Sequence, residues 1–242
     1  MRSISIWLTI ALLVLGLILG VGYLLVSNGV FGLTNPRKVD FPIHGIDVSH
    51  HQGEIDWRAI AQSDYSFAII KATEGGDHRD SKFIENWKAA KDNKVVVGAY
   101  HYYSFCKSPE VQFINFSNFV PRSSGVLPPA IDLEYDNNCN GSIDVKKFRV
   151  DLLLFIHKVE QFYGAKPILY CNEDFYNKYL NIPSFKGCQF WIRNVFKTPY
   201  IGGDVFEFWQ FSSKGKVPGI KGFVDKNVYY GSRENFEKLL IP

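Results

Sequence analysis

Five acidic residues follow short apolar runs that have the composition of β-strands. Asp132 and Glu134 stand in PPAIDLEYD, and Asp47, Glu74 and Asp225 stand in GIDVSHH, IIKATEGG and GFVDKN. Residues i and i+2 of a strand point to the same face, so Asp132 and Glu134 should project together, with Cα atoms roughly 6.8 Å apart. Two close carboxyl groups push their pKa values apart, so that one stays protonated near neutral pH. A protonated acid beside an ionised carboxylate is the pair that glycosidic cleavage requires.

The alternative to a catalytic role for a D-x-E at a strand end is a structural one, as a salt-bridge partner or a loop cap. Aromatic residues in the same segments favour the chemical interpretation, because flat rings stack on sugar faces. They are Tyr100, Tyr102, Tyr135, Trp191 and Trp209. Aromatic residues make up 16% of the chain, but most of the 20 phenylalanines are expected in the core.

The strands and helices that position these acids alternate along the sequence. We expect strands over short β-branched or aromatic runs, at 43–48, 67–72, 95–102, 129–134, 167–171, 190–192, 206–211 and 223–224. We expect helices over 57–62, 81–93, 109–119, 144–162 and 174–180. Such alternation predicts an α/β fold with a mostly parallel sheet, and eight strands predict its closure into a barrel. Function on a barrel lies at the carboxyl ends of its strands, where the acids fall.

The N-terminus has a different composition from the rest. Residues 6–26 contain no charged side chain. A helix of this length spans a bilayer core of roughly 30 Å. We therefore expect a short tail and transmembrane anchor over residues 1–32, a linker over 33–42 and one catalytic domain over 43–242. The alternative is a cleaved signal peptide, whose apolar core is usually shorter.

The remaining composition excludes some classes of protein. A length of 242 residues suits one barrel domain, and a net charge of +3 is too small to indicate nucleic-acid binding. No low-complexity tract or repeat of fixed period follows the linker. The chain is thus expected to be a single globular domain behind a membrane helix.

Six segments in a fixed order resemble the glycoside hydrolase family 25 lysozymes: DVSHHQGEIDW, FAIIKATEG, GAYHYY, PAIDLEY, PILYCN, and FWQF with VDKN. The resemblance extends over roughly residues 43–240. It implies a TIM-like (β/α)5(β)3 barrel. It also implies a muramidase that hydrolyses the β-1,4 bond between N-acetylmuramic acid and N-acetylglucosamine in peptidoglycan.

The resemblance also implies roles for individual residues. Glu134 matches the general acid, and Asp132 matches a partner that stabilises the oxocarbenium-like centre or orients the substrate acetamido group. Asp47 and Asp225 match two further acids of the family's site. The expected substrate-binding residues are Tyr100, Tyr102, Trp191, Arg193, Gln210, Glu74 and His101. Similar enzymes often carry alanine where Arg193 stands, so the sugar or peptide preference is expected to differ.

Two other functions stay open. His44, His50, His51 and His101 with Asp47 suggest metal ligands of a polysaccharide deacetylase, although their spacing matches no established zinc site. A non-catalytic module that binds the cell wall is the other alternative. For the muramidase we expect neither a metal nor another cofactor. We also expect no nucleic acid and no obligate protein partner.

The four cysteines fit a domain outside the cytoplasm. Cys106 and Cys139 follow adjacent strands, so a disulfide between them is plausible in an oxidising compartment. Cys171 and Cys188 are expected at opposite ends of the barrel and unpaired. The expected partners are therefore peptidoglycan strands and, through the N-terminal helix, the membrane.

Overall fold

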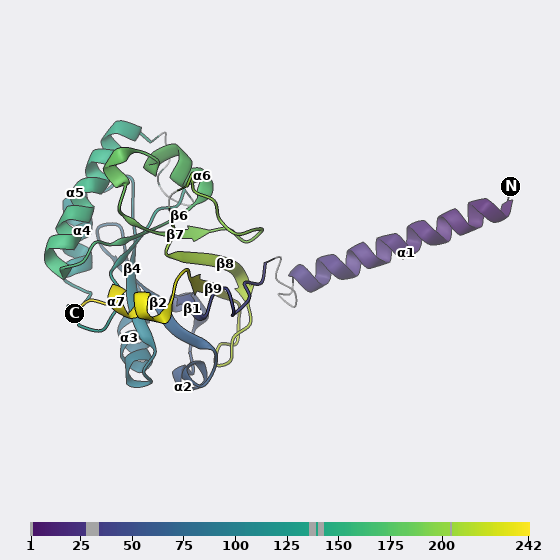
Figure 1. The fold of residues 1–242 in the computed structure, drawn as a ribbon, viewed down its shortest axis with the longest axis horizontal. Helices are drawn as coiled ribbons and strands as arrows, with labels where there is room; N and C mark the ends of the chain where they lie inside the picture. The colour runs from purple at the N-terminus through teal and green to yellow at the C-terminus, as the bar shows by residue number, and fades with distance from the viewer. Residues whose placement is uncertain (1, 28–33, 136–138, 140–142, 204) are drawn as a thin grey trace.

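The computed structural model describes residues 2–27, 34–135, 139, 143–203 and 205–242 (Figure 1). Helix α1 (Arg2–Ser27) extends away from the remaining elements in Figure 1. Crossing a membrane requires both about 20 residues of helix and continuous apolar character. Within the described residues no helix meets both requirements, so the transmembrane helix expected within residues 1–32 is not supported.

Nine strands of the described chain form one closed sheet. Their bounds are β1 Ile43–Val48, β2 Tyr65–Glu74, β3 His78–Arg79, β4 Val96–Tyr102, β5 Ala130–Asp132, β6 Ile168–Asn172, β7 Gln189–Arg193, β8 Phe208–Gly215 and β9 Val224–Tyr229. The neighbour order is β1-β9-β8-β7-β6-β5-β4-β2-β3, and a parallel β1–β2 pairing closes the barrel. β3 lies outside that ring as a short antiparallel partner of β2.

The barrel is parallel from β1 through β2, β4, β5, β6 and β7 to β8, and β9 runs antiparallel to both of its neighbours. The mixed α/β barrel expected from the strand count is therefore confirmed. The last strand is longer than its predicted two residues because it pairs on both sides, with β8 and with β1. That pairing is long-range and cannot be found in the local sequence.

Helices cover the outside of the barrel (Figure 1). Their bounds are α2 Trp57–Ala61, α3 Phe83–Asp92, α4 Pro109–Ser117, α5 Val145–Tyr163, α6 Glu173–Phe175 and α7 Arg233–Leu239. Side chains of Asp and Ser at the N-caps accept hydrogen bonds from backbone N–H groups, as Asp144 does from Lys146 and Lys147. The predicted helix over 174–180 is instead the short α6 followed by a π-helical turn, and α7 was not predicted.

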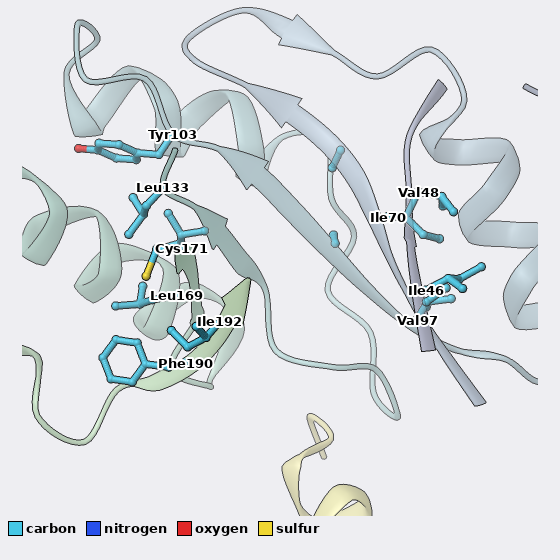
Figure 2. Close-up of a cluster of buried hydrophobic side chains, with 14 of the residues drawn as sticks. Ile46, Val48, Ile70, Val97, Tyr103, Leu133, Leu169, Cys171, Phe190 and Ile192 are labelled. Atoms are coloured by element: carbon cyan, nitrogen blue, oxygen red, sulfur yellow. The ribbon is translucent and has the colours of Figure 1, made fainter. Parts of the chain in front are cut away.

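Alternation along each strand separates two layers of apolar side chains. Inside the barrel, Phe67 and Phe208 pack with their ring centroids 5.4 Å apart. Gly45 on β1 makes room for them, since a Cβ atom there would lie 2.4 Å from the Phe67 ring. Outside, residues such as Ile70 and Leu169 pack under the helices, and Figure 2 shows parts of this outer layer.

The inner layer changes character along the barrel. Apolar residues such as Ile43 and Ile168 lie near the strand starts, and charged residues such as Asp47 and Asp132 lie near the carboxyl ends. Packing therefore closes one end and leaves the polar groups at the other.

One disulfide joins the loops that follow β4 and β5. It links Cys106 to Cys139, with Cα atoms 6.0 Å apart, as predicted. Cys171 is buried and free, and Cys188 is free and half-buried. The disulfide therefore fastens two loops next to the polar end of the barrel.

Candidate active site

A cavity of about 340 Å³ opens at the carboxyl ends of the strands. Its walls combine acids, aromatic rings, amides and one guanidinium group. They are Asp47, Tyr100, Asp132, Glu134, Tyr135, Tyr170, Asn172, Trp191, Arg193, Gln210, Ser213 and Asp225. The cavity thus forms where barrel enzymes place their chemistry.

Strand register sets the positions of the four acids. Asp132 ends β5 between two tyrosines, Tyr102 on β4 and Tyr170 on β6. Glu134 follows two residues later and lines the same cavity, as the alternation of a strand predicts. On the opposite side, Asp47 of β1 and Asp225 of β9 are direct partners in an antiparallel pair. Side chains of such partners lie close together, with Cβ atoms roughly 5 Å apart.

A chain of hydrogen bonds connects both acid pairs. Trp191 Nε1 donates to Asn227 Oδ1 at 2.8 Å, and Asn227 Nδ2 donates to Asp47 Oδ2 at 2.7 Å. Gln210 Nε2 donates to the same carboxylate oxygen at 2.9 Å. These contacts hold Asp47 between two amide donors inside the barrel.

Tyr170 continues this chain to the catalytic candidate. Its hydroxyl lies 2.9 Å from Gln210 Oε1 and 3.3 Å from Glu134 Oε1, and it donates toward these acceptors. The ring is buried and packs on Trp191 with centroids 4.4 Å apart. The hydroxyl is therefore held in place beside Glu134.

Burial changes the protonation of the acids. It raises the pKa of Asp47 to about 6, although the amides of Asn227 and Gln210 favour the charged form. The pKa of Asp132 lies well above its ordinary range, first because of burial and then because of the charge of Glu134. Asp132 Oδ1 is also buried without a hydrogen-bond partner among the described residues. Burial and the neighbouring Glu134 therefore both disfavour the ionised form of Asp132.

Asp225 has the same kind of shift. Burial and then the Asp47 carboxylate raise its pKa to about 8, against the opposing charge of Arg193. Burial therefore disfavours the ionised form of Asp47, Asp132 and Asp225 alike.

The raised pKa of Asp225 predicts how stability depends on pH. Between about pH 4 and about pH 8 the folded carboxyl holds a proton that the unfolded chain releases, so stability falls as pH rises. Asp225→Asn removes this group, and the drop in Tm across that range should shrink by on the order of 10 °C. Thermal unfolding across the pH range measures it, with exposed Asp77→Asn as the control. An unchanged drop in Asp225→Asn would contradict the assignment.

The structure brings together most of the predicted site residues. Asp47, Asp132, Glu134, Asp225, Tyr100, Trp191, Arg193 and Gln210 all line the cavity. Their individual roles remain predictions.

Three predicted substrate-binding residues do not line the cavity. His101 points outward from β4, fully buried, with Nδ1 2.7 Å from Thr73 Oγ1 and its ring stacked on Phe155. His101 therefore lies outside the cavity wall and presents no exposed surface to a ligand. Glu74 instead pairs with Lys71, whose Nζ also lies 5.2 Å from the centre of the Tyr102 ring.

Several polar groups of the site are not among the residues predicted from the sequence. They are Tyr170, Asn172 and Ser213 in the cavity wall and Asn227 beneath it. Alternation from Ile168 on β6 places Tyr170 and Asn172 on the inner face, and alternation from Asp225 does the same for Asn227. That signal was present in PILYCN and VDKN.

Of the histidines suggested as metal ligands, His50 and His51 lie side by side with ring centroids 4.0 Å apart, whereas His44 and His101 contact other residues. His44 is buried on the outer face of β1, and His50 Nδ1 contacts Asp80 Oδ2 at 2.7 Å. His101 is occupied by Thr73 and Gln112. In the described part of the chain, no three His, Cys, Asp or Glu residues are grouped as ligands for an ion.

Comparisons with known proteins agree with this geometry. The family model for glycosyl hydrolases family 25 matches residues 46–220. A family 25 glycosyl hydrolase structure from Bacillus anthracis has a TM-score of 0.79 and 34% identity, and the match covers 86% of this chain and 97% of that one. The curated protein YegX of Escherichia coli K12, described as uncharacterized, is 36% identical over 81% of this chain and 73% of its own length. Lysozyme M1 of Streptomyces globisporus is 29% identical over 78% of this chain and 68% of its own length.

Proposed function

The chain belongs to the glycosyl hydrolases family 25 and is a glycoside hydrolase, and from this premise we propose that it is a lysozyme acting on peptidoglycan. The bond cleaved is the β-1,4 linkage between N-acetylmuramic acid and N-acetylglucosamine. Relatives named lysozyme and N,O-diacetylmuramidase support this activity. The observation that carries the proposal is that Asp132 and Glu134, at the end of β5, line the same cavity.

In this proposal Glu134 is the general acid. Its carboxyl group lines the cavity, is less buried than that of Asp132, and lies within reach of the Tyr170 hydroxyl. Glu134 protonates the leaving oxygen as the glycosidic bond breaks and the sugar ring becomes oxocarbenium-like. Tyr170 donates to the carboxylate that remains. Water then forms the new bond at the anomeric carbon and returns a proton to Glu134.

Asp132 is the second member of the pair. Burial raises the pKa of its carboxyl group and disfavours the ionised form that direct attack on the sugar needs, so hydrogen bonding to the substrate acetamido group suits it better. Asp47 and Asp225 complete the acidic wall on the other side of the cavity. The amides on Asp47 keep that wall in a fixed geometry.

Products from defined peptidoglycan test the reaction. Mass analysis after borohydride reduction should find muropeptides that end in reduced muramic acid. Reduced glucosamine ends would make the enzyme a glucosaminidase, and anhydro ends would make it a lytic transglycosylase. Release of acetate without chain cleavage would instead support the deacetylase alternative, and no product at all would support the binding module.

We also propose that the domain works outside the cytoplasm, on the cell-wall side. Its proposed substrate lies there, and disulfides such as Cys106–Cys139 persist in oxidising compartments. Fusion of the chain to a reporter that is active only after export tests the location. Signal from a cytoplasm-only reporter would contradict it.

A further inference from the structure

Arg193 differs from every other residue in the described cavity wall because it alone carries a fixed positive charge. It is the last residue of β7, and its strand neighbours in register are Asn172 on β6 and Gln210 on β8. All three side chains line the cavity. The guanidinium group is therefore placed among the groups that face a bound glycan.

The polar neighbours of Arg193 are already engaged elsewhere. Gln210 uses its amide nitrogen for Asp47 and its oxygen for Tyr170. Asn172 Oδ1 accepts the backbone N–H of Phe175 at the start of α6. The guanidinium group of Arg193 forms no hydrogen bond or ion pair with another described residue. Its five N–H donors thus remain available within the cavity.

The acidic side chains of the cavity wall form no ion pair with this guanidinium group. Asp47 and Asp225 feel its charge, yet neither forms an ion pair with it. Asp47 is held by two amides. A half-buried guanidinium group without a protein partner is costly, and a ligand that supplies one offsets that cost.

We propose that Arg193 is a carboxylate-binding site within the groove, which recognises an acidic substituent on the muramic acid side of the glycan. This inference rests on the proposed function. The planar fork of arginine matches a carboxylate in two parallel hydrogen bonds. The N-acetylglucosamine units carry no charge, whereas muramic acid has a lactyl carboxyl group, free or extended by a stem peptide that bears carboxylates of its own.

The position of Arg193 also reduces the repulsion between the acidic cavity wall and an anionic substrate. Four acidic side chains line it, and an anionic substrate is repelled wherever they are ionised. One guanidinium group beside them gives the substrate carboxylate a local partner. Arg193 therefore selects an acidic glycan over a neutral one such as chitin.

The test changes the substrate before it changes the protein. Initial rates of the wild type are measured on peptidoglycan whose carboxyl groups are intact or converted to neutral methylamides. A second pair is made from glycan stripped by an amidase, with the lactyl carboxylate free or methylamidated. Neutralisation should raise KM about tenfold, with kcat changed much less, in the pair that holds the recognised carboxylate. The first pair identifies the stem peptide and the second the lactyl group.

Variants then connect this effect to one side chain. Arg193→Gln should have a raised KM on the acidic substrate and no further response to neutralisation, and Arg193→Lys should keep part of the response. Lys197→Gln removes the same charge four residues later, on an exposed position outside the cavity, and should behave as wild type. Circular dichroism confirms that each variant is folded.

The outcomes separate the two proposals. Equal KM on acidic and neutralised substrates in the wild type overturns the carboxylate site and leaves the lysozyme assignment intact. An undiminished response in Arg193→Gln overturns the role of this residue. If the wild type cleaves none of the four substrates, the proposed function fails, and the inference that depends on it fails too.

Discussion

Replacing Glu134 with glutamine is expected to lower kcat on peptidoglycan by about 1,000-fold, with KM changed only slightly. Glutamine keeps the size and the hydrogen bond to Tyr170 but has no acidic proton to give to the leaving oxygen. Release of soluble muropeptides, measured as reducing ends over time, gives both constants. Because the substitution is nearly isosteric, the Tm should stay close to that of the wild type.

Two further variants make this result specific. Asp174→Asn neutralises an exposed acid after β6 that does not line the cavity, and its kcat should match the wild type. Asp132→Asn keeps a neutral group able to hydrogen-bond, so its kcat should fall less than that of Glu134→Gln. A Glu134→Gln enzyme with the wild-type rate would make the general-acid assignment wrong, whatever the other variants do.

The second large effect is expected on stability. The disulfide between Cys106 and Cys139 closes a loop with a sequence separation of 33. Loop-closure entropy predicts that its removal costs about 3 to 4 kcal/mol, which is roughly 10 °C in Tm for a domain of this size. The double variant Cys106→Ser/Cys139→Ser should therefore unfold at a lower temperature than the wild type, and reductant should lower the wild type to the same value.

Free cysteine supplies the control for that measurement. Cys188→Ser removes a half-buried thiol that forms no disulfide, and its Tm should stay within a few degrees of the wild type and keep its sensitivity to reductant. If reductant leaves the wild-type Tm unchanged while mass analysis shows both thiols free, the bridge does not stabilise the folded protein.

Local sequence was enough to predict much of this molecule. Asp132 and Glu134 end an apolar run, and period-two alternation alone places them on one face. The same rule places His101 on the outer face, because it alternates with Tyr100, which lines the cavity. Closeness in the sequence to the site therefore does not by itself place a side chain in the cavity.

Other features depend on pairing between distant strands. The register of β2 against β4 shifts between Lys71 and Thr73, and this irregularity sends Thr73 to His101 and leaves Glu74 with Lys71. No property of IIKATEGG predicts that shift. The hydrogen bonds of Asn227 with Trp191 and Asp47 likewise depend on the position of β9 between β1 and β8.

The hydrogen bonds around Asp47 have a fixed direction. Trp191 Nε1 can only donate, so Asn227 must present its oxygen to the indole and its amide nitrogen to Asp47. Gln210 is oriented in the same way, with its nitrogen toward Asp47 and its oxygen toward Tyr170. The side-chain amides of Asn227 and Gln210 are therefore each held in one of their two possible orientations.

The hydrogen of the Tyr170 hydroxyl has two acceptors within reach, Gln210 Oε1 and Glu134 Oε1. When it points to Gln210, the phenol oxygen can accept a hydrogen bond from a protonated Glu134, and when it points to Glu134, it donates a hydrogen bond to an ionised one. Rotation of one O–H bond thus suits both the protonated and the ionised form of Glu134, the two forms that its proposed general-acid role requires. The Trp191 indole at the other end of the network fixes the orientation of the Asn227 amide, so this rotation requires no flip of that amide.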